Sequence, residues 1–181
     1  MELASQQTLP VSQADAWAAL NDIALLQSCI PGCESITPTG DNQYEVLVTA
    51  AVGPVKAKFK GKLRLDNLQP SQSYTLQFEG QGGAAGHAKG SAEVTLSAVS
   101  TQETLLSYTA KAQVGGRIAQ IGSRLVDMAA QKMAGDFFTA FSERLKERFP
   151  AAAAPVPAVA SAGSWWGRLW AAIRRWFGAG R

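Results

Sequence analysis

The residues with the clearest capacity for chemistry are two cysteines and one histidine. Cys29 and Cys33 flank the tripeptide Ile-Pro-Gly, and His87 is the single histidine of the chain. A catalytic triad or proton relay built on histidine would have to centre on His87, and a zinc site normally takes four ligands. Three such side chains are too few for a zinc site, so we expect no metal site. We also expect no catalytic role for His87. We expect the cysteines to be free structural thiols, with a disulfide as the alternative in an oxidising compartment.

The segment GQGGAAGHAKGS, residues 80–91, has a glycine spacing that resembles a phosphate-binding loop. Gly80, Gly82 and Ala85 fit the pattern G-x-G-x-x-A. A dinucleotide fingerprint must open a helix, whereas this segment runs into the alternating stretch AEVTLSAV. The order Lys-Gly-Ser at 89–91 also differs from the Gly-Lys-Ser of a P-loop. We therefore interpret the glycines as bends, bulges or points of close approach to the backbone, and we find no catalytic constellation.

The positive charge of the chain is concentrated at its C-terminal end. The formal net charge is +3, but residues 1–150 contain 13 Lys and Arg against 14 Asp and Glu. All cations beyond that point are arginines, and no acidic residue accompanies them. This distribution argues against a nucleic-acid footprint across the whole domain. The first residues lack the basic and apolar regions of a secretory signal, so we expect a cytoplasmic protein.

The hydropathy pattern predicts an α+β domain. Residues 3–9 precede a helix over QADAWAALND, where Ser12 and Asp15 are spaced as in a capping box, and a second short helix over 23–28. The period then changes to two until about residue 114, with turn-like segments between the runs, as in an antiparallel meander. A helical period returns and continues over 116–149, which predicts one long helix with a broad apolar face.

One predicted strand carries a row of cations on a single face. In VKAKFKGKLRL, residues 55–65, every second side chain is basic and the side chains between them are apolar or small. Such a row is typical of a solvent-facing strand surface, and the alternative is a docking stripe for an acidic partner or an anionic lipid. The candidate docking residues are Lys56, Lys58, Lys60, Lys62 and Arg64.

The C-terminal end of the chain combines a linker with an amphipathic segment. Residues 150–163, rich in Ala and Pro, have the composition of a semi-stiff linker. In residues 164–178 the apolar side chains fall within about 140° of a helical wheel, and the segment is too short and too charged to span a bilayer. We predict a helix on an anionic membrane surface; the alternatives are packing on the domain or docking into a partner protein. The predicted membrane-binding residues are Trp165, Trp166, Arg168, Leu169, Trp170, Ile173, Arg174, Arg175, Trp176 and Phe177.

The order of these elements is similar to the helix-grip fold of the START-like (SRPBCC) ligand-binding superfamily. Four stretches more specifically resemble the CoxG family, the G subunits of carbon monoxide dehydrogenase: CIPGCESI (29–36), GPVKAKFKGKL (53–63), GQGGAAGHAKGSAEV (80–94) and VGGRIAQIGSRLVDMAAQKMAGDFFTAF (114–141). The resemblance implies a curved antiparallel sheet wrapped around a long C-terminal helix over residues 1–149.

The resemblance also implies a function. It implies a non-catalytic accessory protein that recruits a molybdenum-type carbon monoxide dehydrogenase, or a related molybdenum hydroxylase, to the inner face of the cell membrane. Members of the superfamily typically enclose an apolar cavity, here suited to a quinone or another lipid. The alternatives are a stand-alone cyclase, which would need a polar group such as Tyr108, His87 or a carboxylate in the cavity, and a lipid-binding or transfer protein.

Strand parity and helix periodicity together predict which side chains would line the cavity. On the strands we expect inward-facing residues opposite an apolar face of the long helix, although a bulge at a glycine would shift the parity. A filled core would use the same residues. The predicted lining is Val46, Phe59, Phe78, Val94 and Tyr108 from the strands and Ile121, Leu125, Met128 and Met133 from the helix.

Overall fold

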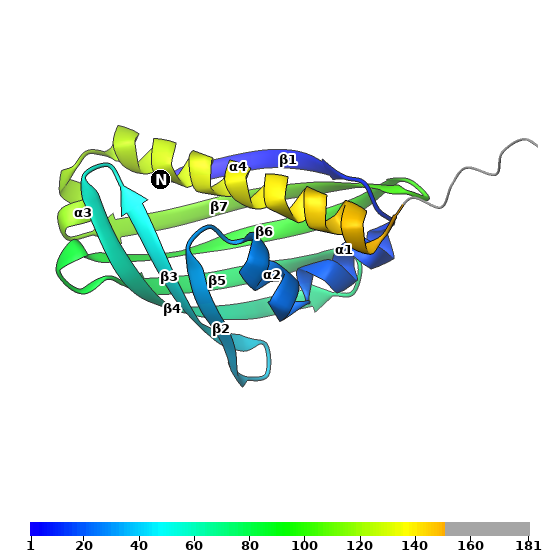
Figure 1. Ribbon diagram of the computed structural model, residues 1–181, viewed down its shortest axis with the longest axis horizontal. Coiled ribbons are helices and arrows are strands. Elements are labelled where there is room, and N and C mark those ends of the chain that lie inside the picture. Colours follow the sequence, from blue (N-terminus) through cyan, green and yellow to red (C-terminus); the bar gives the residue numbers. More distant parts are fainter. Residues whose placement is uncertain (151–181) are drawn as a thin grey trace, which may run out of the picture. The chain divides into compact units, whose positions relative to one another are not determined.

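Seven antiparallel strands form one curved sheet, and a long helix lies along its inner face (Figure 1). The computed structural model describes residues 1–150. The strands are β1 (Glu2–Leu9), β2 (Cys33–Gly40), β3 (Gln43–Val52), β4 (Val55–Gln69), β5 (Ser73–Gln81), β6 (His87–Ser100) and β7 (Glu103–Gly115). Their order is β1-β7-β6-β5-β4-β3-β2. The strands after β1 therefore follow one another as a meander, and β1 closes onto β7, which confirms the predicted α+β fold.

The helices occupy the connections at the start and the end of the domain. They are α1 (Gln13–Leu20), α2 (Ile23–Cys29), the 3₁₀ turn η1 (Gly83–Ala85), α3 (Arg117–Gln120) and α4 (Ser123–Arg148). Helix α1 begins at the expected cap: the hydroxyl of Ser12 accepts the amide N–H of Asp15 and donates to its carboxylate. Exchange of hydrogen bonds between these positions satisfies an amide that has no partner within the helix.

The helix expected over 116–149 is divided in two, and this part of the prediction is wrong. Gly122 has a φ of 98°, which separates α3 from α4. A residue with a side chain rarely adopts this conformation, whereas glycine does so at little cost. The long helix therefore starts at Ser123, and α3 turns separately at the end of β7.

The core lies beneath the C-terminal half of α4. Phe141 and Leu145 have no exposed surface there, and they belong to one cluster with Leu9 of β1 and Ala16 of α1. Thr104 is the one polar residue buried in the described domain, and its hydroxyl donates to the carbonyl of Val11 at 2.9 Å. Burial of an aromatic side chain of this kind contributes several kcal/mol, so this end of α4 is fixed firmly on the sheet.

Two glycines of the glycine-rich segment make room for aromatic rings of the inner face. A Cβ at Gly82 would lie 2.4 Å from the ring of Phe59, and one at Gly90 would lie 2.8 Å from the ring of Phe78. Any side chain at these positions would displace a ring. The segment forms the end of β5, the η1 turn and the start of β6, so its glycines serve close packing.

An ion pair joins the end of α4 to the start of α2. Asp22 accepts the amide of Leu25 through one carboxylate oxygen and binds Arg148 through the other. The hydrogen bond from Arg148, followed by that from Leu25, lowers the pKa of Asp22 below its usual value. The same carboxylate thus caps α2 and holds the last turn of α4.

The predicted linker after Pro150 and the predicted helix over 164–178 lie outside the described residues. Both stay predictions. Within residues 1–150, no helix is both long and apolar enough to cross a membrane.

We predict that Asp22→Asn makes the free energy of unfolding less dependent on pH in the acidic range. Because the folded state lowers the pKa of Asp22, its contribution is fully present above the unfolded value of about 3.9 and is lost as the pH falls through the lower folded value. Asparagine still caps a helix, so the substitution removes mainly the ion pair. Chemical denaturation between neutral and acidic pH should show a less stable variant at neutral pH and a difference that shrinks as the pH falls. Asp41→Asn, in the exposed β2–β3 turn, is the control; equal behaviour of the two variants would contradict the prediction.

Candidate functional site

An apolar cavity of about 230 Å³ lies between the inner face of the sheet and the helices α2 and α4. Six strands contribute to its wall, and α1, α2 and the C-terminal half of α4 close it. No Asp, Glu, Lys, Arg, His or Cys is among the lining residues, which are Leu20, Asn21, Ile23, Leu26, Ile30, Ile36, Tyr44, Leu63, Leu65, Tyr74, Leu76, Ala92, Val94, Leu106, Tyr108, Phe137 and Phe138. Ligand pockets are typically apolar with a few polar groups, and their volumes start at about 300 Å³. This cavity therefore suits a single ring or a short acyl segment.

Aromatic side chains of α4 form the roof of the cavity. Phe138 stacks on Tyr108 of β7 with ring centroids 5.4 Å apart, and Phe137 meets Phe138 edge to face at 5.0 Å. Phe137 in turn stacks on Phe141 of the core at 5.5 Å. Such aromatic pairs add to the energy of burial, so the roof is continuous with the most buried part of α4.

All three tyrosines of the chain line this cavity. Tyr44 lies on β3, Tyr74 on β5 and Tyr108 on β7. Tyr74 and Tyr108 both pair with Val94 of the intervening strand β6, so Tyr74, Val94 and Tyr108 form one row across the sheet. The cavity thus has neutral phenol hydroxyls as its main polar groups.

The hydroxyl of Tyr74 forms no hydrogen bond with any residue in the described part of the chain. Burial raises the pKa of Tyr74 to about 12. The rings of Tyr74 and Trp17 meet edge to face, with their centroids 5.9 Å apart. The pKa of Tyr108 is also raised by burial, although a hydrogen bond with the side chain of Ser5 opposes this effect. Tyr74 is therefore a proton donor that lacks an acceptor inside an apolar cavity.

The residues predicted to line the cavity are distributed over several places. Val94 and Tyr108 line it. Val46, Phe59 and Phe78 have the inward parity of their strands but lie outside the lining, and Ile121 lies beside Gly53 of the β3–β4 hairpin. Leu125, Met128 and Met133 instead line an open groove of about 490 Å³ between α4 and the end of β3.

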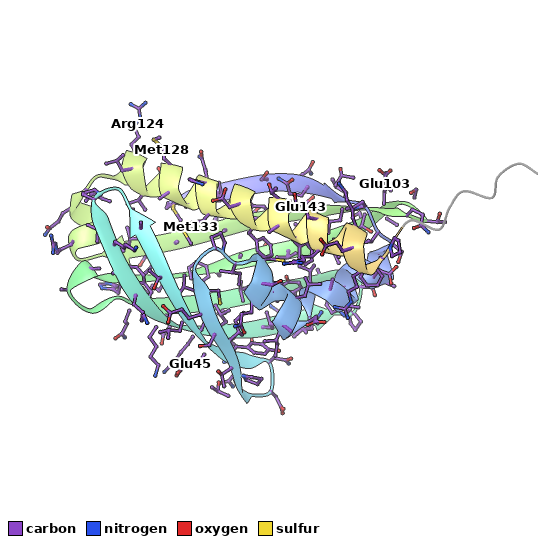
Figure 2. All side chains as sticks on the ribbon, viewed as in Figure 1. Glu45, Glu103, Arg124, Met128, Met133 and Glu143 are labelled. Atoms are coloured by element: carbon purple, nitrogen blue, oxygen red, sulfur yellow. The ribbon has the colours of Figure 1, made fainter. Side chains whose placement is uncertain are left out.

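The position of α1 and α2 explains this distribution. Both helices lie at the end of the sheet that the C-terminal half of α4 covers, and α2 packs against α4 there. The N-terminal half of α4 has no such neighbour, so 44% of Leu125 and 56% of Met128 are exposed. Figure 2 shows Met128 and Arg124 projecting from this half of the helix. The roof is consequently Phe137 and Phe138, which helical periodicity alone did not separate from the other apolar positions.

The cations of β4 lie on the outer face, where acidic side chains of neighbouring residues pair with most of them. Lys58 pairs with Glu34 at 2.7 Å and Lys60 with Glu45 at 3.0 Å. The remaining pairs are Lys62 with Glu79 at 3.9 Å and Arg64 with Asp66 at 2.8 Å. Lys56 has no such partner among residues 1–150. The pairing reduces the positive field that a docking stripe would need.

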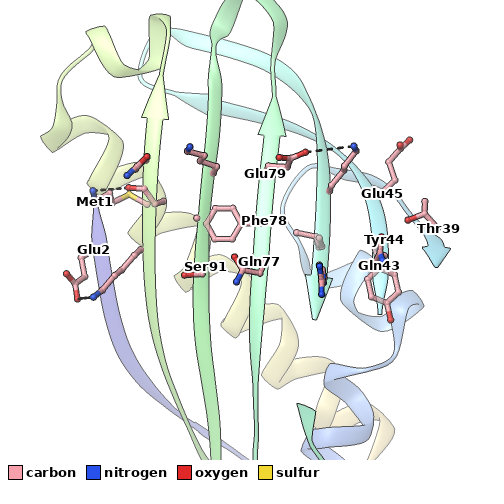
Figure 3. A pocket seen from close by; sticks show the side chains of 18 residues that line it. Met1, Glu2, Thr39, Gln43, Tyr44, Glu45, Gln77, Phe78, Glu79 and Ser91 are labelled. Atoms are coloured by element: carbon pink, nitrogen blue, oxygen red, sulfur yellow. Dashed lines mark hydrogen bonds and ion pairs between the residues drawn. The ribbon is translucent and has the colours of Figure 1, made fainter. Parts of the chain in front are cut away.

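The outer face also holds a broad polar depression of about 1140 Å³, shown in Figure 3. It crosses the sheet from Glu2 to Thr39 and contains two ion pairs, Lys62 with Glu79 and Lys111 with Glu2 at 3.7 Å. Tyr44 lines both this depression and the apolar cavity. Tyr44 therefore marks the rim between the two.

The other residues with capacity for chemistry lie apart from the cavity. Cys29 and Cys33 are free thiols, and burial is the main cause of their raised pKa values. They are therefore protonated and weakly nucleophilic at neutral pH. His87 is exposed, with its ring against Gly115. The predicted membrane-binding residues, from Trp165 to Phe177, lie outside the described residues.

Sequence reasoning missed the contribution of α2 and of Tyr74 to the cavity. Ile23, Leu26 and Ile30 recur at a helical spacing, which was the available signal for an apolar face on α2. Tyr74 lies directly opposite Val94 in the sheet, but this register becomes visible only when the two strands are paired.

Solved structures share this architecture. A conserved protein from Geobacillus kaustophilus superposes with a TM-score of 0.77 at 26% identity, covering 81% of this chain and 96% of that one. The ZhuI aromatase/cyclase of Streptomyces sp. R1128 gives 0.63 at 13% identity (84% and 98% covered). A START superfamily protein from Mycobacterium smegmatis gives 0.64 at 12% identity (81% and 98% covered). The last two likenesses show the fold alone.

Sequence comparison identifies the family. No curated protein matches the chain. The family profile that matches is that of CoxG, the G subunit of carbon monoxide dehydrogenase, over residues 6–146. The match covers nearly all of the described domain, including every strand that lines the cavity. The chain therefore belongs to the CoxG family of carbon monoxide dehydrogenase subunits.

Proposed function

We propose that this protein is a non-catalytic accessory protein that carries an apolar ligand, a quinone or another lipid, in the cavity beneath α4. The observation that carries the proposal is an apolar cavity lined by Tyr74, whose phenol hydroxyl has no hydrogen-bond acceptor among residues 1–150. The family takes its name from carbon monoxide dehydrogenase. We infer that the partner is a molybdenum-type carbon monoxide dehydrogenase or a related molybdenum hydroxylase.

The chemistry of the lining favours binding over catalysis. General acid–base catalysis requires a group whose pKa lies near the working pH. Among the described residues, none that lines the cavity is a carboxylic acid, an amine, an imidazole or a thiol. Tyr74, with its pKa raised to about 12, stays protonated at neutral pH. It can donate a hydrogen bond but is a poor base, which argues against the cyclase alternative.

The lining also accounts for the class of ligand. A ring of the size of an aromatic side chain buries about 150–250 Å², which corresponds to about 4–6 kcal/mol at 25 cal/mol per Å². A carbonyl oxygen on that ring would satisfy the hydroxyl of Tyr74. The cavity is too small for a long lipid chain as a whole, so such a chain would extend past the rim at Tyr44.

Membrane attachment through the C-terminal segment completes the proposal. The arginines and tryptophans of residues 164–178 suit an anionic membrane surface. A carrier held at the inner face of the membrane has direct access to apolar ligands dissolved there. The protein would then bring its partner enzyme and a membrane-soluble electron carrier to the same place.

We predict that Leu76→Trp removes ligand that co-purifies with the protein. Leu76 lines the cavity, and an indole would occupy most of the space at a cost of about 1–3 kcal/mol in stability. Native mass spectrometry and solvent extraction should find a quinone or lipid in the wild type and none in the variant. Val99→Trp, at an exposed position, is the matched control and should retain the ligand. Ligand content that is equal in both variants would contradict a cavity site.

We predict that Tyr74→Phe weakens ligand binding without loss of stability. The ring remains in place, so area burial is unchanged, while the loss of one hydrogen bond lowers affinity about five- to tenfold. The free energy of unfolding of the ligand-free variant should stay close to that of the wild type, because the hydroxyl has no hydrogen bond to lose within residues 1–150. Titration with a short-chain quinone measures the affinity, and thermal unfolding measures the stability. A less stable variant with unchanged affinity would mean that Tyr74 is only structural.

We predict that replacement of Trp166, Trp170 and Trp176 by Glu weakens attachment to anionic vesicles by at least tenfold. The substitution removes apolar burial and adds repulsion from the anionic lipid. Vesicle flotation of the full chain measures attachment. The control carries the same change of charge in the domain, through Gln69→Glu, Gln72→Glu and Gln102→Glu, and should bind like the wild type. If the tryptophan variant binds vesicles as well as the wild type does, residues 164–178 are not the membrane anchor.

A further inference from the structure

One end of the domain brings three separate connections together. They are the β3–β4 hairpin around Gly53, the η1 turn, and α3 with the first turn of α4. A Cβ added at Gly53 would lie within 4 Å of the side chains of Ile121 and Leu125. A Cβ added at Gly116 would lie within 4 Å of the backbone of Gly86. We call this region the hairpin end; it lies at the left of Figure 1, opposite the C-terminus of α4.

Apolar side chains are exposed at the hairpin end. Leu125 and Met128 are the most exposed large apolar residues of α4, at 44% and 56%. Pro54 at the tip of the hairpin is exposed beside them. These residues belong to the start of a helix and the tip of a hairpin.

Most of the charged side chains at the hairpin end are basic. Residues 50–63, 80–92 and 111–126 contain no Asp or Glu, and Asp127, whose Oδ1 atom is buried, is the acidic residue that follows them in α4. Lys56, Arg117 and Arg124 are exposed there and have no ion-pair partner within residues 1–150. The N-terminus of α4, which has no side-chain cap, adds partial positive charge. The opposite end carries acidic side chains, among them Glu103 and Glu143 in Figure 2.

We propose that the hairpin end is a second membrane-contact surface, which lies on anionic lipid when the protein is attached. This inference extends the proposed membrane attachment from the tail to the folded domain. Exposed apolar side chains surrounded by unpaired cations match the lipid interface, where apolar groups enter between headgroups and cations meet phosphates. The excess of cations over acidic residues selects this end, because at the other end acidic residues such as Glu143 and Glu147 accompany the cations and are repelled by the same surface.

Contact at the hairpin end also sets the orientation of the domain. The groove between α4 and β3 is lined by Leu125, Met128 and Met133, so it would face the lipid. The polar depression of the outer sheet face would stay in water, available to a partner enzyme.

The test compares two charge reversals on the same helix of the full chain. Arg124→Glu lies at the hairpin end and Lys146→Glu at the opposite end; both positions are exposed. Each basic residue near an anionic surface contributes about fivefold in binding. Partition onto phosphatidylcholine vesicles containing phosphatidylglycerol should fall at least fivefold for Arg124→Glu and less than twofold for Lys146→Glu. Met128→Glu should also lower it at least fivefold.

Hydrogen exchange of the wild type supplies an independent measure that does not depend on a variant. Added anionic vesicles should protect amides in residues 50–56 and 117–128. Protection confined to residues 164–178, or equal effects of the two charge reversals, would overturn the inference and leave the proposed role of the tail intact. Protection of the hairpin end in the variant without tail tryptophans would support the inference even if the tail fails its own test. Protection that increases with protein concentration without vesicles would indicate self-association and would also overturn it.

Discussion

The packing of α4 on the inner face of the sheet is the interaction on which the rest of the structure depends. The sheet has an apolar inner face that must be covered, and α4 is the element long enough to cross it. Its C-terminal half is fixed by Phe141 and Leu145, which have no exposed surface, and by the ion pair of Arg148 with Asp22. Because interiors pack densely, the anchored end of the helix determines how far the helix stands from the sheet along its length.

The cavity is a consequence of this anchoring. Phe137 and Phe138 lie one turn before the fixed core and bridge to the sheet through Tyr108. The helices α1 and α2 cover the same end, so a cavity remains that is almost free of polar groups. Its phenol hydroxyls are neutral over the physiological range. A site of this chemistry holds a ligand by area and orients it by a hydrogen bond, and it offers little that would activate a covalent reaction.

The two ends of the domain differ because the ends of α4 differ in their neighbours. At one end the helix is covered, and Arg144 and Arg148 meet acidic partners. At the other end it leaves Leu125 and Met128 uncovered near cations without partners among residues 1–150. On the outer face, most cations of β4 meet acidic side chains, as Lys60 does with Glu45 of the adjacent strand β3.

The sequence by itself determined which face of the sheet each side chain occupies. Alternation in β4 placed the lysines outside and residues such as Leu63 inside, and the spacing of Ser12 and Asp15 located the start of α1. These properties depend on neighbours a few residues away, as does the amphipathic pattern of residues 164–178. Only the tertiary structure decided which inward-facing residues enclose a cavity, where Gly122 divides the long helix, and which cations are paired. Enclosure depends on where α2 and α4 cross the sheet, and ion pairs depend on strand register. Both arise from packing between residues far apart in the chain, which a local pattern does not report.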